Sequence, residues 1–218
     1  MFSGVAPRYD ILNHLLSLGI DGRWRKEVAR SLELSTADRV LDLCCGTGDL
    51  AFAMAPRVNC FACDFTWEML TLAKKKALRK AATVHLAAAD ALALPFPKES
   101  FEAVTVAFGA RNLENLELGL GEFHRVLRRG GSVIILEFTR PRGLLLRIPY
   151  AFYLHIILPL IGRLVSDERG AYRYLADSIA GFPDTETLSG KLRNVGYSDV
   201  KYRLLTGGIV AIHVGRKS

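Results

Sequence analysis

One cluster of residues in this sequence has the types and spacing needed to bind a charged ligand. An apolar run ends near Asp42 and continues into Gly46-Thr47-Gly48, and a second apolar run, residues 58–63, ends at Asp64. Glycines let the backbone approach a flat, polar ligand closely, and an acid at the end of the next strand can hold ribose hydroxyls. The pattern predicts a site for a nucleoside cofactor.

The charges around the glycines indicate which nucleoside is bound. Residues 46–51 also fit the dinucleotide fingerprint in its Ala-ended form, so NAD is a competitor. Its pyrophosphate would lie at a helix N-terminus beside Asp49, with Asp42 just behind the loop. These carboxylates disfavour a pyrophosphate but attract the sulfonium and ammonium groups of S-adenosylmethionine. A plain glycine turn would not explain the acids Asp42, Asp64 and Asp90 together, so S-adenosylmethionine is the predicted cofactor.

Short apolar segments alternate with helical ones and would position these residues. The predicted strands are residues 39–43, 58–64, 83–88, 101–108, 131–139, 200–205 and 209–215, and the predicted helices are residues 49–55, 66–80 and 116–127. This order predicts an α/β fold with a parallel sheet and helices on both faces. The last two strands are joined only by Thr206-Gly207-Gly208, so an antiparallel pair is expected at the C-terminal edge. Ligands of such sheets bind beyond the carboxyl ends of the strands.

Composition favours one domain that works in the cytoplasm. The 218 residues contain no repeat, low-complexity run or long linker, so residues 1–218 are predicted to form a single domain. The N-terminus lacks the charged and then apolar regions of a secretory signal. The net charge of +7 suggests nucleic acid, but no basic stripe interleaved with aromatic residues is present, and contact with a membrane surface is the favoured explanation. The oligomeric state stays open, a homodimer included.

No metal site is expected, although the cysteines are close in sequence. Cys60 and Cys63 fall on one predicted strand at an odd offset, which directs them to opposite faces of the sheet. Adjacent Cys44 and Cys45 are equally poor chelators, and all four are predicted to be buried thiols in a reducing compartment. The histidines lack the i, i+4 spacing of a metal-binding helix, and His124 is expected at the surface.

The chain resembles the ubiquinone/menaquinone biosynthesis C-methyltransferase family over residues 2–217. The motifs that carry the resemblance are Pro7-Arg-Tyr-Asp-Ile-Leu-Asn13, Ser17-Leu-Gly-Ile20, Trp24, residues 42–49 and 90–96, Ala107-Phe-Gly-Ala-Arg-Asn112, Arg125-Val-Leu127, Leu136-Glu-Phe138, Tyr172-Arg-Tyr-Leu175 and residues 207–213. Many methyltransferases share the glycine loop, whereas the combination of the later motifs is close to specific. The resemblance implies a class I S-adenosylmethionine-dependent methyltransferase (Rossmann-like) fold, with a seven-stranded, mostly parallel sheet. It also implies a structural role for His213.

The resemblance further implies methyl transfer from S-adenosylmethionine to a ring carbon of a polyprenylated quinol. A demethylmenaquinol acceptor is favoured, and a 2-polyprenyl-6-methoxy-1,4-benzoquinol is the alternative. The glycine pattern and the motif positions together predict these cofactor contacts: Asp42, Gly46, Thr47, Gly48, Asp64, Asp90 and Ala91. One departure is visible, because Cys44 and Cys45 stand where the family usually has Ala or Gly. The larger side chains are expected to weaken donor binding by crowding the methionine moiety.

Arg111 and Asn112 are the predicted catalytic residues. The enzyme must align a nucleophilic ring carbon with the sulfonium, exclude water and raise electron density on the ring. Arg111 would stabilise the developing phenolate or polarise a water that removes the proton, since a guanidinium stays charged at ordinary pH. The plain alternative for Arg111 is a surface ion pair.

The acceptor is expected to bind the region after residue 139. Residues 148–161 form an apolar run bracketed by Arg147 and Arg163, too short to span a bilayer and interrupted by two prolines. This composition suits a lid for a lipophilic substrate at an anionic membrane surface, and a buried core helix is the alternative. Residues 140–182 are therefore predicted to be a helical acceptor-binding insertion. The N-terminal Tyr9 and Asp10 are expected to fold over the cofactor, although a helix cap is an equally simple role for Asp10.

Two other functions stay open at this point. Methyltransferases that act on exocyclic base nitrogens usually carry an Asn/Asp-Pro-Pro-aromatic turn after the fourth strand, whereas residues 108–112 read Phe-Gly-Ala-Arg-Asn. An RNA or DNA methyltransferase is therefore disfavoured. A noncatalytic nucleotide-binding protein is the other alternative, and measured methyl transfer would separate it from an enzyme.

Overall fold

A computed structural model describes Ser17 and residues 19–32, 34–139, 141, 143, 150, 152 and 169–218, without the side chains of residues 169–173 and 175. The predictions made for Tyr9 and Asp10 lie outside the described residues. So do those for residues 148–161, apart from Tyr150 and Phe152.

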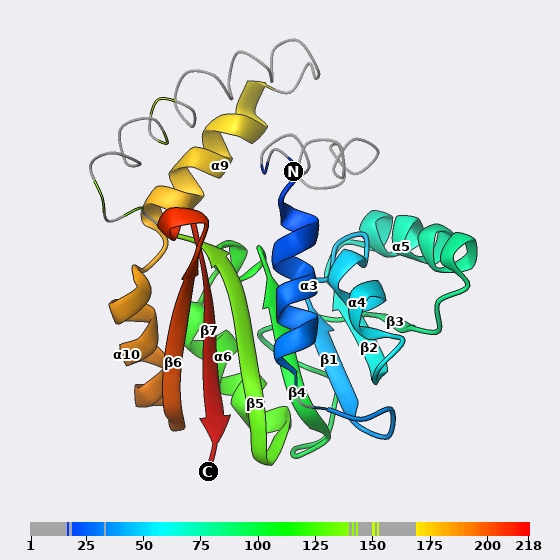
Figure 1. Cartoon of the computed structure of the whole chain (residues 1–218). Coiled ribbons are helices and arrows are strands. Elements are labelled where there is room, and N and C mark those ends of the chain that lie inside the picture. The colour runs from blue at the N-terminus through cyan, green and yellow to red at the C-terminus, as the bar shows by residue number, and fades with distance from the viewer. Residues whose placement is uncertain are drawn as a thin grey trace.

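A seven-stranded sheet forms the centre of the molecule, in the order β3-β2-β1-β4-β5-β7-β6 (Figure 1). The strands are β1 (Arg39–Leu43), β2 (Asn59–Asp64), β3 (His85–Ala88), β4 (Phe101–Ala107), β5 (Leu127–Phe138), β6 (Tyr197–Leu205) and β7 (Val210–Lys217). The pairings among β1 to β5 are parallel, and β7 runs antiparallel to both of its neighbours. The predicted seven strands, the mostly parallel sheet and the antiparallel C-terminal pair are confirmed.

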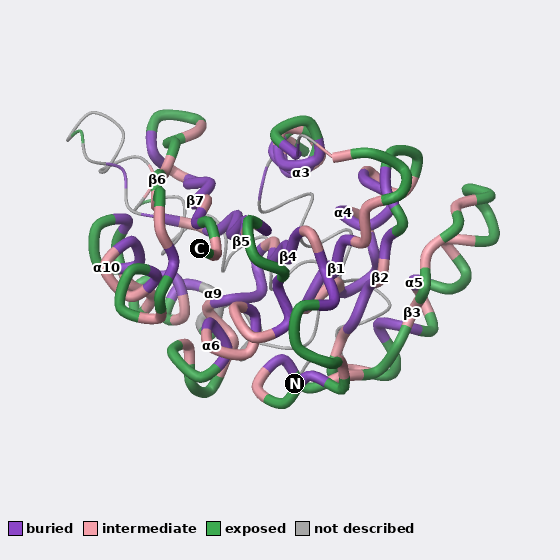
Figure 2. Tube along the Cα trace, turned by 90° about the horizontal axis from the view of Figure 1, so that it is seen from below, coloured by how far each residue is buried: buried purple, intermediate pink, exposed green. Residues whose placement is uncertain are grey.

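Helices cover both faces of this sheet (Figure 2). They are α3 (Asp21–Ser31), α4 (Asp49–Met54), α5 (Trp67–Lys80), α6 (Leu116–Val126), α9 (Arg169–Gly181) and α10 (Thr185–Val195), with the short 3₁₀ turns η2 (Ala110–Asn112) and η4 (Thr206–Gly208). Helices α3 and α4 pack together on one face, and α6 and α10 pack together on the other. Helices α3 and α10 were not predicted. The ends of α10 nevertheless carry clear signals, because Asp184 accepts a hydrogen bond from the Thr187 N–H and Gly196 ends the helix in the left-handed conformation.

The boundary between α6 and β5 differs from the prediction. The structure ends α6 at Val126 and starts β5 at once with Leu127, which pairs with Phe101. The register then shifts, so that Ala103 pairs with Ser132. Gly131 fits this irregular stretch because a Cβ there would lie 2.8 Å from the carbonyl oxygen of Glu102.

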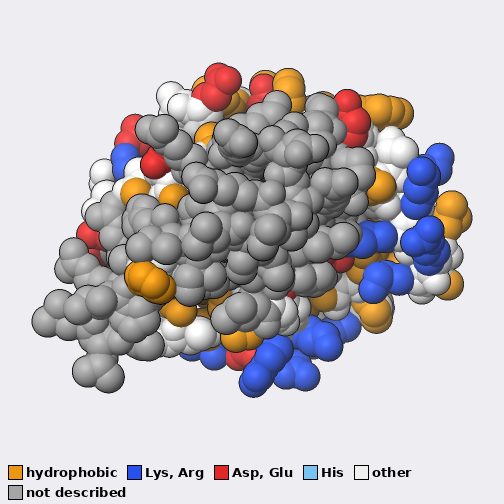
Figure 3. Space-filling model, turned by 90° about the horizontal axis from the view of Figure 1, so that it is seen from above, with side chains coloured by type: hydrophobic (Ala, Val, Ile, Leu, Met, Phe, Trp, Pro, Cys, Tyr) orange, Lys and Arg blue, Asp and Glu red, His pale blue; other side chains and the backbone are white. Residues whose placement is uncertain are grey.

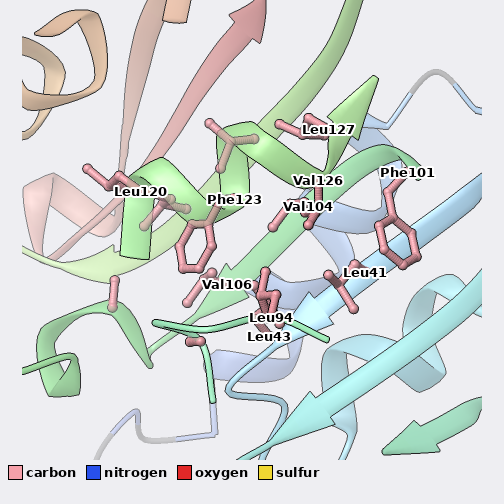
Figure 4. Packing of buried hydrophobic residues seen from close by; sticks show 14 of the residues in the cluster. Leu41, Leu43, Leu94, Phe101, Val104, Val106, Leu120, Phe123, Val126 and Leu127 are labelled. Atoms are coloured by element: carbon pink, nitrogen blue, oxygen red, sulfur yellow. The ribbon is translucent and has the colours of Figure 1, made fainter. Parts of the chain in front are cut away.

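Two apolar clusters pack on the two faces of the sheet. Figure 4 shows the one beneath α6, in which Phe123 and Leu120 of the helix lie over residues of β1 and β4. Cys63 belongs to this cluster and Cys60 to the one beneath α3 and α4, so the predicted opposite orientation of the two thiols is confirmed. Burial raises the pKa of Cys63 to about 12, and this thiol therefore stays protonated at neutral pH.

Two histidines pack within this framework. The His213 Nε2 lies 3.1 Å from the Thr185 carbonyl oxygen and so links β7 to α10, as a structural role requires. The His124 ring is partly buried rather than fully at the surface, and it meets Tyr197 edge-on with ring centroids 5.0 Å apart.

Among the helices that the structure describes, none is both long and apolar enough to cross a membrane.

Candidate functional site

A pocket of about 250 Å³ opens at the carboxyl ends of β1, β2 and β4, where the sequence predicted a site. Its walls come from the glycine loop after β1, the first turn of α5, the turn around Asp90 and the loop after β4. The lining residues are Leu43, Cys44, Gly46, Cys63, Asp64, Phe65, Thr66, Met69, Ala89, Asp90, Ala91, Leu92, Phe108, Gly109, Asn112, Leu113 and Glu114.

The glycine loop turns sharply between β1 and α4. Gly46 and Gly48 have φ angles of +55° and +87°, which glycine adopts at little cost. A Cβ on Gly48 would also lie 2.8 Å from the Phe52 ring. Cys44 takes a φ of +51°, and a Cβ on Gly109 would lie only 2.3 Å from the Cys44 Cβ. The Cys44 side chain therefore occupies the space that a side chain at position 109 would need.

Asp64 ties the glycine loop to the end of β2. Its Oδ2 accepts a hydrogen bond of 2.8 Å from the Gly46 N–H, and its Oδ1 accepts one of 2.8 Å from the Thr66 N–H. A carboxylate oxygen can accept more than one hydrogen bond, so both oxygens can still receive a ligand hydroxyl. Asp64 therefore supports the loop and also lines the pocket.

Asp42 lies behind the loop and does not line the pocket. Its Oδ1 accepts a hydrogen bond of 2.8 Å from the Thr105 hydroxyl, whereas no described group donates to the buried Oδ2. Burial raises the pKa of Asp42 to about 7, against the opposing effects of that hydrogen bond and of the Arg25 charge. Asp42 thus supports the end of β1 through its bond to Thr105 of β4, and it lies outside the pocket lining.

Thr47, Gly48 and Asp49 also lie outside the lining of the pocket. The Lys76 ammonium of α5 donates 2.8 Å hydrogen bonds to the Thr47 hydroxyl and to the Asp49 carboxylate. The charge of Asp49 is therefore balanced by Lys76, so Asp49 does not disfavour a pyrophosphate as the sequence suggested.

Other acidic residues give the pocket its negative charge. Asp64, Asp90 and Glu114 line it, and none of the described lining residues is Lys or Arg. The exposed Asp90 shapes its turn by accepting a hydrogen bond of 2.8 Å from the Leu92 N–H, and Ala91 lies buried beside it. This acidic pocket in a chain of net charge +7 favours a cationic ligand over a phosphate.

Several lining residues were not predicted. Phe65 lines the pocket although it is 79 % exposed, and Met69, Leu113 and Glu114 line it as well. The position of Phe65 directly after Asp64 was the available sequence signal. Leu113 and Glu114 directly follow the predicted catalytic residue Asn112, but nothing in the local sequence marked them as part of the pocket.

The two predicted catalytic residues are placed differently. Asn112 lines the pocket, and its Oδ1 accepts a hydrogen bond of 3.0 Å from the Tyr174 hydroxyl of α9. The Arg111 guanidinium is not part of the lining. It forms a buried ion pair with Glu137 of β5 at 2.8 Å, and these side chains are 7 % and 2 % exposed.

Further contacts hold Arg111 in this inward orientation. Its guanidinium donates to the Phe108 carbonyl oxygen at 2.5 Å and lies 5.6 Å from the centre of the Phe138 ring. Phe108 itself has a φ of +58°, so the loop after β4 begins with a turn that the Arg111 contact helps to hold. The structure thus brings Asn112 to the pocket and turns Arg111 toward the core.

Comparison with known proteins identifies the family. The sequence profile of the ubiE/COQ5 methyltransferase family matches residues 1–217. The chain belongs to this family. It is 46% identical over 218 residues to the demethylmenaquinone methyltransferase of Thermus thermophilus, covering 99% of both chains. It is 42% identical over 223 residues to the ubiquinone/menaquinone biosynthesis C-methyltransferase UbiE of Geobacter sulfurreducens, covering 100% of this chain and 87% of that one. The family expected from the sequence motifs is confirmed.

Solved structures with low sequence identity share the fold. An S-adenosylmethionine-dependent methyltransferase from Thermotoga maritima, described as a possible histamine N-methyltransferase, superposes with a TM-score of 0.72 at 18% identity. That match covers 100% of this chain and 98% of the other. The predicted class I methyltransferase fold is therefore confirmed.

Proposed function

We propose that this ubiE/COQ5 family member transfers a methyl group from S-adenosylmethionine to a ring carbon of a polyprenylated quinol. The observation that carries the proposal is the family match over residues 1–217, together with an acidic pocket at the carboxyl ends of β1, β2 and β4. The Thermus thermophilus relative is named a demethylmenaquinone methyltransferase, so demethylmenaquinol is the proposed acceptor. The Geobacter sulfurreducens name includes ubiquinone biosynthesis and keeps the methoxy-benzoquinol as the second candidate.

The residues of the pocket fit S-adenosylmethionine. When bound, this cofactor supplies a methyl group made electrophilic by the positive sulfonium. Asp64 offers both carboxylate oxygens to ribose hydroxyls, and the exposed ring of Phe65 beside it offers a stacking surface for a purine. Gly46 lets the backbone come close, and the acidic lining attracts the two positive charges of the donor. Asp90 and Ala91 also line the pocket and are proposed to contact the base of the nucleoside.

The role of Cys44 follows from its place in the lining. Its side chain lies between the glycine loop and Gly109, at the part of the pocket where the methionine moiety would approach the acceptor. Burial raises the pKa of this thiol, which keeps it neutral at physiological pH. We propose that Cys44 narrows the pocket and has no part in the chemistry.

The loop after β4 is the proposed acceptor side of the pocket. Asn112 presents its side chain to the pocket and can orient a quinol hydroxyl, while Tyr174 fixes the amide through its hydroxyl. Arg111 is proposed to act as a positioning residue, because its ion pair with Glu137 holds the loop that presents Asn112. Leu92 and Leu113 add apolar surface that helps to exclude water from the reacting ring.

We also propose where the acceptor tail binds and where in the cell the protein acts. A polyprenyl tail requires apolar surface, and residues 140–182 are proposed to form the helical part that binds it, within a single domain of residues 1–218. Helix α9 lies in this stretch, and its Tyr174 contacts the pocket residue Asn112. Action in the cytoplasm, at the inner face of the membrane, is proposed from the lipophilic acceptor and the net charge of +7. A homodimer stays a prediction that awaits measurement.

The test is direct methyl transfer by the purified protein. Short-tailed demethylmenaquinol, the methoxy-benzoquinol and an RNA oligonucleotide are each incubated with S-adenosylmethionine, and the products are identified by mass spectrometry. We expect a mass gain of one methylene on the demethylmenaquinol under reducing conditions and none on its oxidised quinone, because only the quinol feeds hydroxyl electron density into the ring. Methylation of RNA alone, or equal rates for the quinone and the quinol, would contradict the proposal.

A further inference from the structure

The outer face of α5 carries a surface that the proposed methyl transfer does not use. Trp67 and Leu78 are 71 % and 77 % exposed, although both are large apolar residues. Leu78 is eleven positions after Trp67, which is three helical turns, so they lie on the same side of the helix about 16 Å apart. Single exposed apolar residues are common, but two in line on one helix face are less so.

Basic residues fill the space between and beside these two side chains. Lys74 and Lys75 are exposed between Trp67 and Leu78, and Arg79 follows at the end of the helix. We call these five residues the α5 ridge. Within the described part of the chain no ion pair is formed by Lys74, Lys75 or Arg79, in contrast to Lys76, which binds Asp49 beneath the helix. Glu68 is the one acidic residue in the α5 sequence.

The position of the ridge relates it to the pocket. Trp67 is three residues after Asp64, and its neighbours Phe65, Thr66 and Met69 all line the pocket. Figure 3 looks down on the carboxyl ends of the parallel strands, and Lys and Arg side chains gather with hydrophobic ones at the right-hand margin, the side on which α5 lies in Figure 1. The ridge therefore begins at the mouth of the pocket and runs outward along the same end of the molecule.

We propose that the α5 ridge docks the protein on an anionic lipid bilayer, with Trp67 and Leu78 in the interface and the three basic side chains on lipid phosphates. Tryptophan favours the boundary between headgroups and acyl chains, and each Lys or Arg near an anionic surface adds attraction. Nucleic acid would also attract the basic side chains, but Leu78 would gain nothing from a phosphate backbone. The inference rests on the proposed function, since a polyprenylated acceptor resides in the bilayer and must reach the pocket from there.

Sedimentation with lipid vesicles tests the ridge. The wild-type protein is mixed with vesicles of phosphatidylglycerol and phosphatidylcholine, and with vesicles of phosphatidylcholine alone. We expect binding only to the anionic vesicles, and a loss of about 30-fold in Lys74→Gln/Lys75→Gln, which corresponds to about 1 kcal/mol for each basic residue at 1.4 kcal/mol per tenfold. The matched control is Lys98→Gln/Arg129→Gln, which removes two exposed charges near the amino ends of β4 and β5 and should bind like wild type. Equal losses in both variants would overturn the ridge and leave only a net-charge effect.

Trp67 provides a second readout in the same experiment. The chain has two tryptophans, and Trp24 is only 5 % exposed, so a blue shift of the emission on vesicle binding reports Trp67. We expect that shift, and quenching by lipids labelled in the upper acyl chain, in the wild type but not in Lys74→Gln/Lys75→Gln, which keeps Trp67. Binding to vesicles without any shift of the wild-type emission would overturn the placement of Trp67 in the interface. Preference for a single-stranded RNA over the anionic vesicles would overturn the choice of partner.

Activity on a tail-less, water-soluble quinol separates this inference from the proposed function. Without vesicles, Lys74→Gln/Lys75→Gln should methylate that acceptor at the wild-type rate, because neither residue lines the pocket. A loss of this rate would mean that the ridge acts on the site and not on a membrane. Vesicle binding by a wild-type protein that methylates no quinol would overturn the proposed function alone, and quinol methylation without vesicle binding would overturn the ridge alone.

Discussion

Replacing Arg111 with Ala should destabilise the fold more than it weakens donor binding. The Arg111 guanidinium and the Glu137 carboxylate are 2.8 Å apart, and their side chains are 7 % and 2 % exposed. Removing the cation leaves a buried carboxylate without its partner, which typically costs about 3–5 kcal/mol. The contact with the Phe138 ring at 5.6 Å is lost as well. In a chain of this size each kcal/mol lowers Tm by about 2–4 °C, so we expect a decrease of roughly 6–20 °C.

The assay is urea unfolding of four proteins that form a double-mutant cycle. These are the wild type, Arg111→Met, Glu137→Gln and the double variant, and Met is chosen because it keeps much of the apolar volume of Arg. Each single variant leaves one buried charge, whereas the double variant leaves none, so most of the lost free energy of unfolding should return in the double variant. S-adenosylmethionine affinity, measured by calorimetry well below Tm, should stay close to wild type throughout because neither side chain lines the pocket.

A direct catalytic role for Arg111 predicts the opposite results for stability and kcat. If the guanidinium stabilised a developing phenolate, Arg111→Met would keep its stability and lose kcat on the order of 100-fold, and Glu137→Gln would not restore activity. Wild-type stability in Arg111→Met, combined with such a loss, would refute the reasoning from the ion pair. Recovery of both stability and kcat in the double variant would identify Arg111 as a positioning residue.

Three further outcomes are expected from the geometry of the pocket. Asp64→Ala should weaken S-adenosylmethionine binding in calorimetry by about 10- to 150-fold, which corresponds to about 1.5–3 kcal/mol for hydrogen bonds to a charged group. Tight NAD binding by the wild-type protein would contradict the assignment of the donor. Gly109→Ala should lower the free energy of unfolding in urea by about 1–3 kcal/mol, because its Cβ would lie 2.3 Å from the Cys44 Cβ. Adding Cys44→Gly to this variant should restore most of the lost stability, whereas adding Cys44→Ser should not. Burial raises the pKa of Asp42 from 3.8 to about 7, so the folded protein keeps a proton that the unfolded chain loses as pH rises from 4 to 7. The free energy of unfolding should therefore fall over that window by at most roughly 4 kcal/mol. Asp42→Asn should abolish this fall when unfolding is measured at pH 4.5 and pH 8.

The sheet was predictable because its strands are short apolar runs bounded by polar residues. The seven predicted strands differ from the observed ones mainly at their ends, with the largest difference in β5, where an irregular pairing around Gly130 and Gly131 extends the strand back to Leu127. Helix α3 was missed because its eleven residues contain four Lys or Arg and few apolar residues, so a buried face around Trp24 and Val28 is hard to see without its partners. Helix α10 could have been found from its caps alone.

The candidate site was predictable where a local motif sets the geometry. Gly46 and Asp90 follow strands of the parallel sheet and Asp64 ends one, so their meeting at one end follows from the topology. The orientation of Arg111 could not be inferred in this way. Its partner Glu137 is 26 residues away on β5, and only the folded structure shows that the two side chains share one buried space.

Long-range partners also explain why the charge around the glycine loop differs from the charge expected from the sequence. The sequence predicts that Asp49 and Asp64 both lie near the glycine loop, since Asp49 follows it directly and Asp64 ends the next strand. Lys76 reaches Asp49 from the third turn of α5 and balances its charge, whereas Asp64 accepts hydrogen bonds from the backbone N–H groups of Gly46 and Thr66 and forms no ion pair with the residues that the structure describes. A backbone donor holds a carboxylate in place without removing its charge, so Asp64 stays available to a cationic ligand. The preference for S-adenosylmethionine over a dinucleotide therefore depends on which acids lack a basic partner, and not on how many acids lie near the glycines.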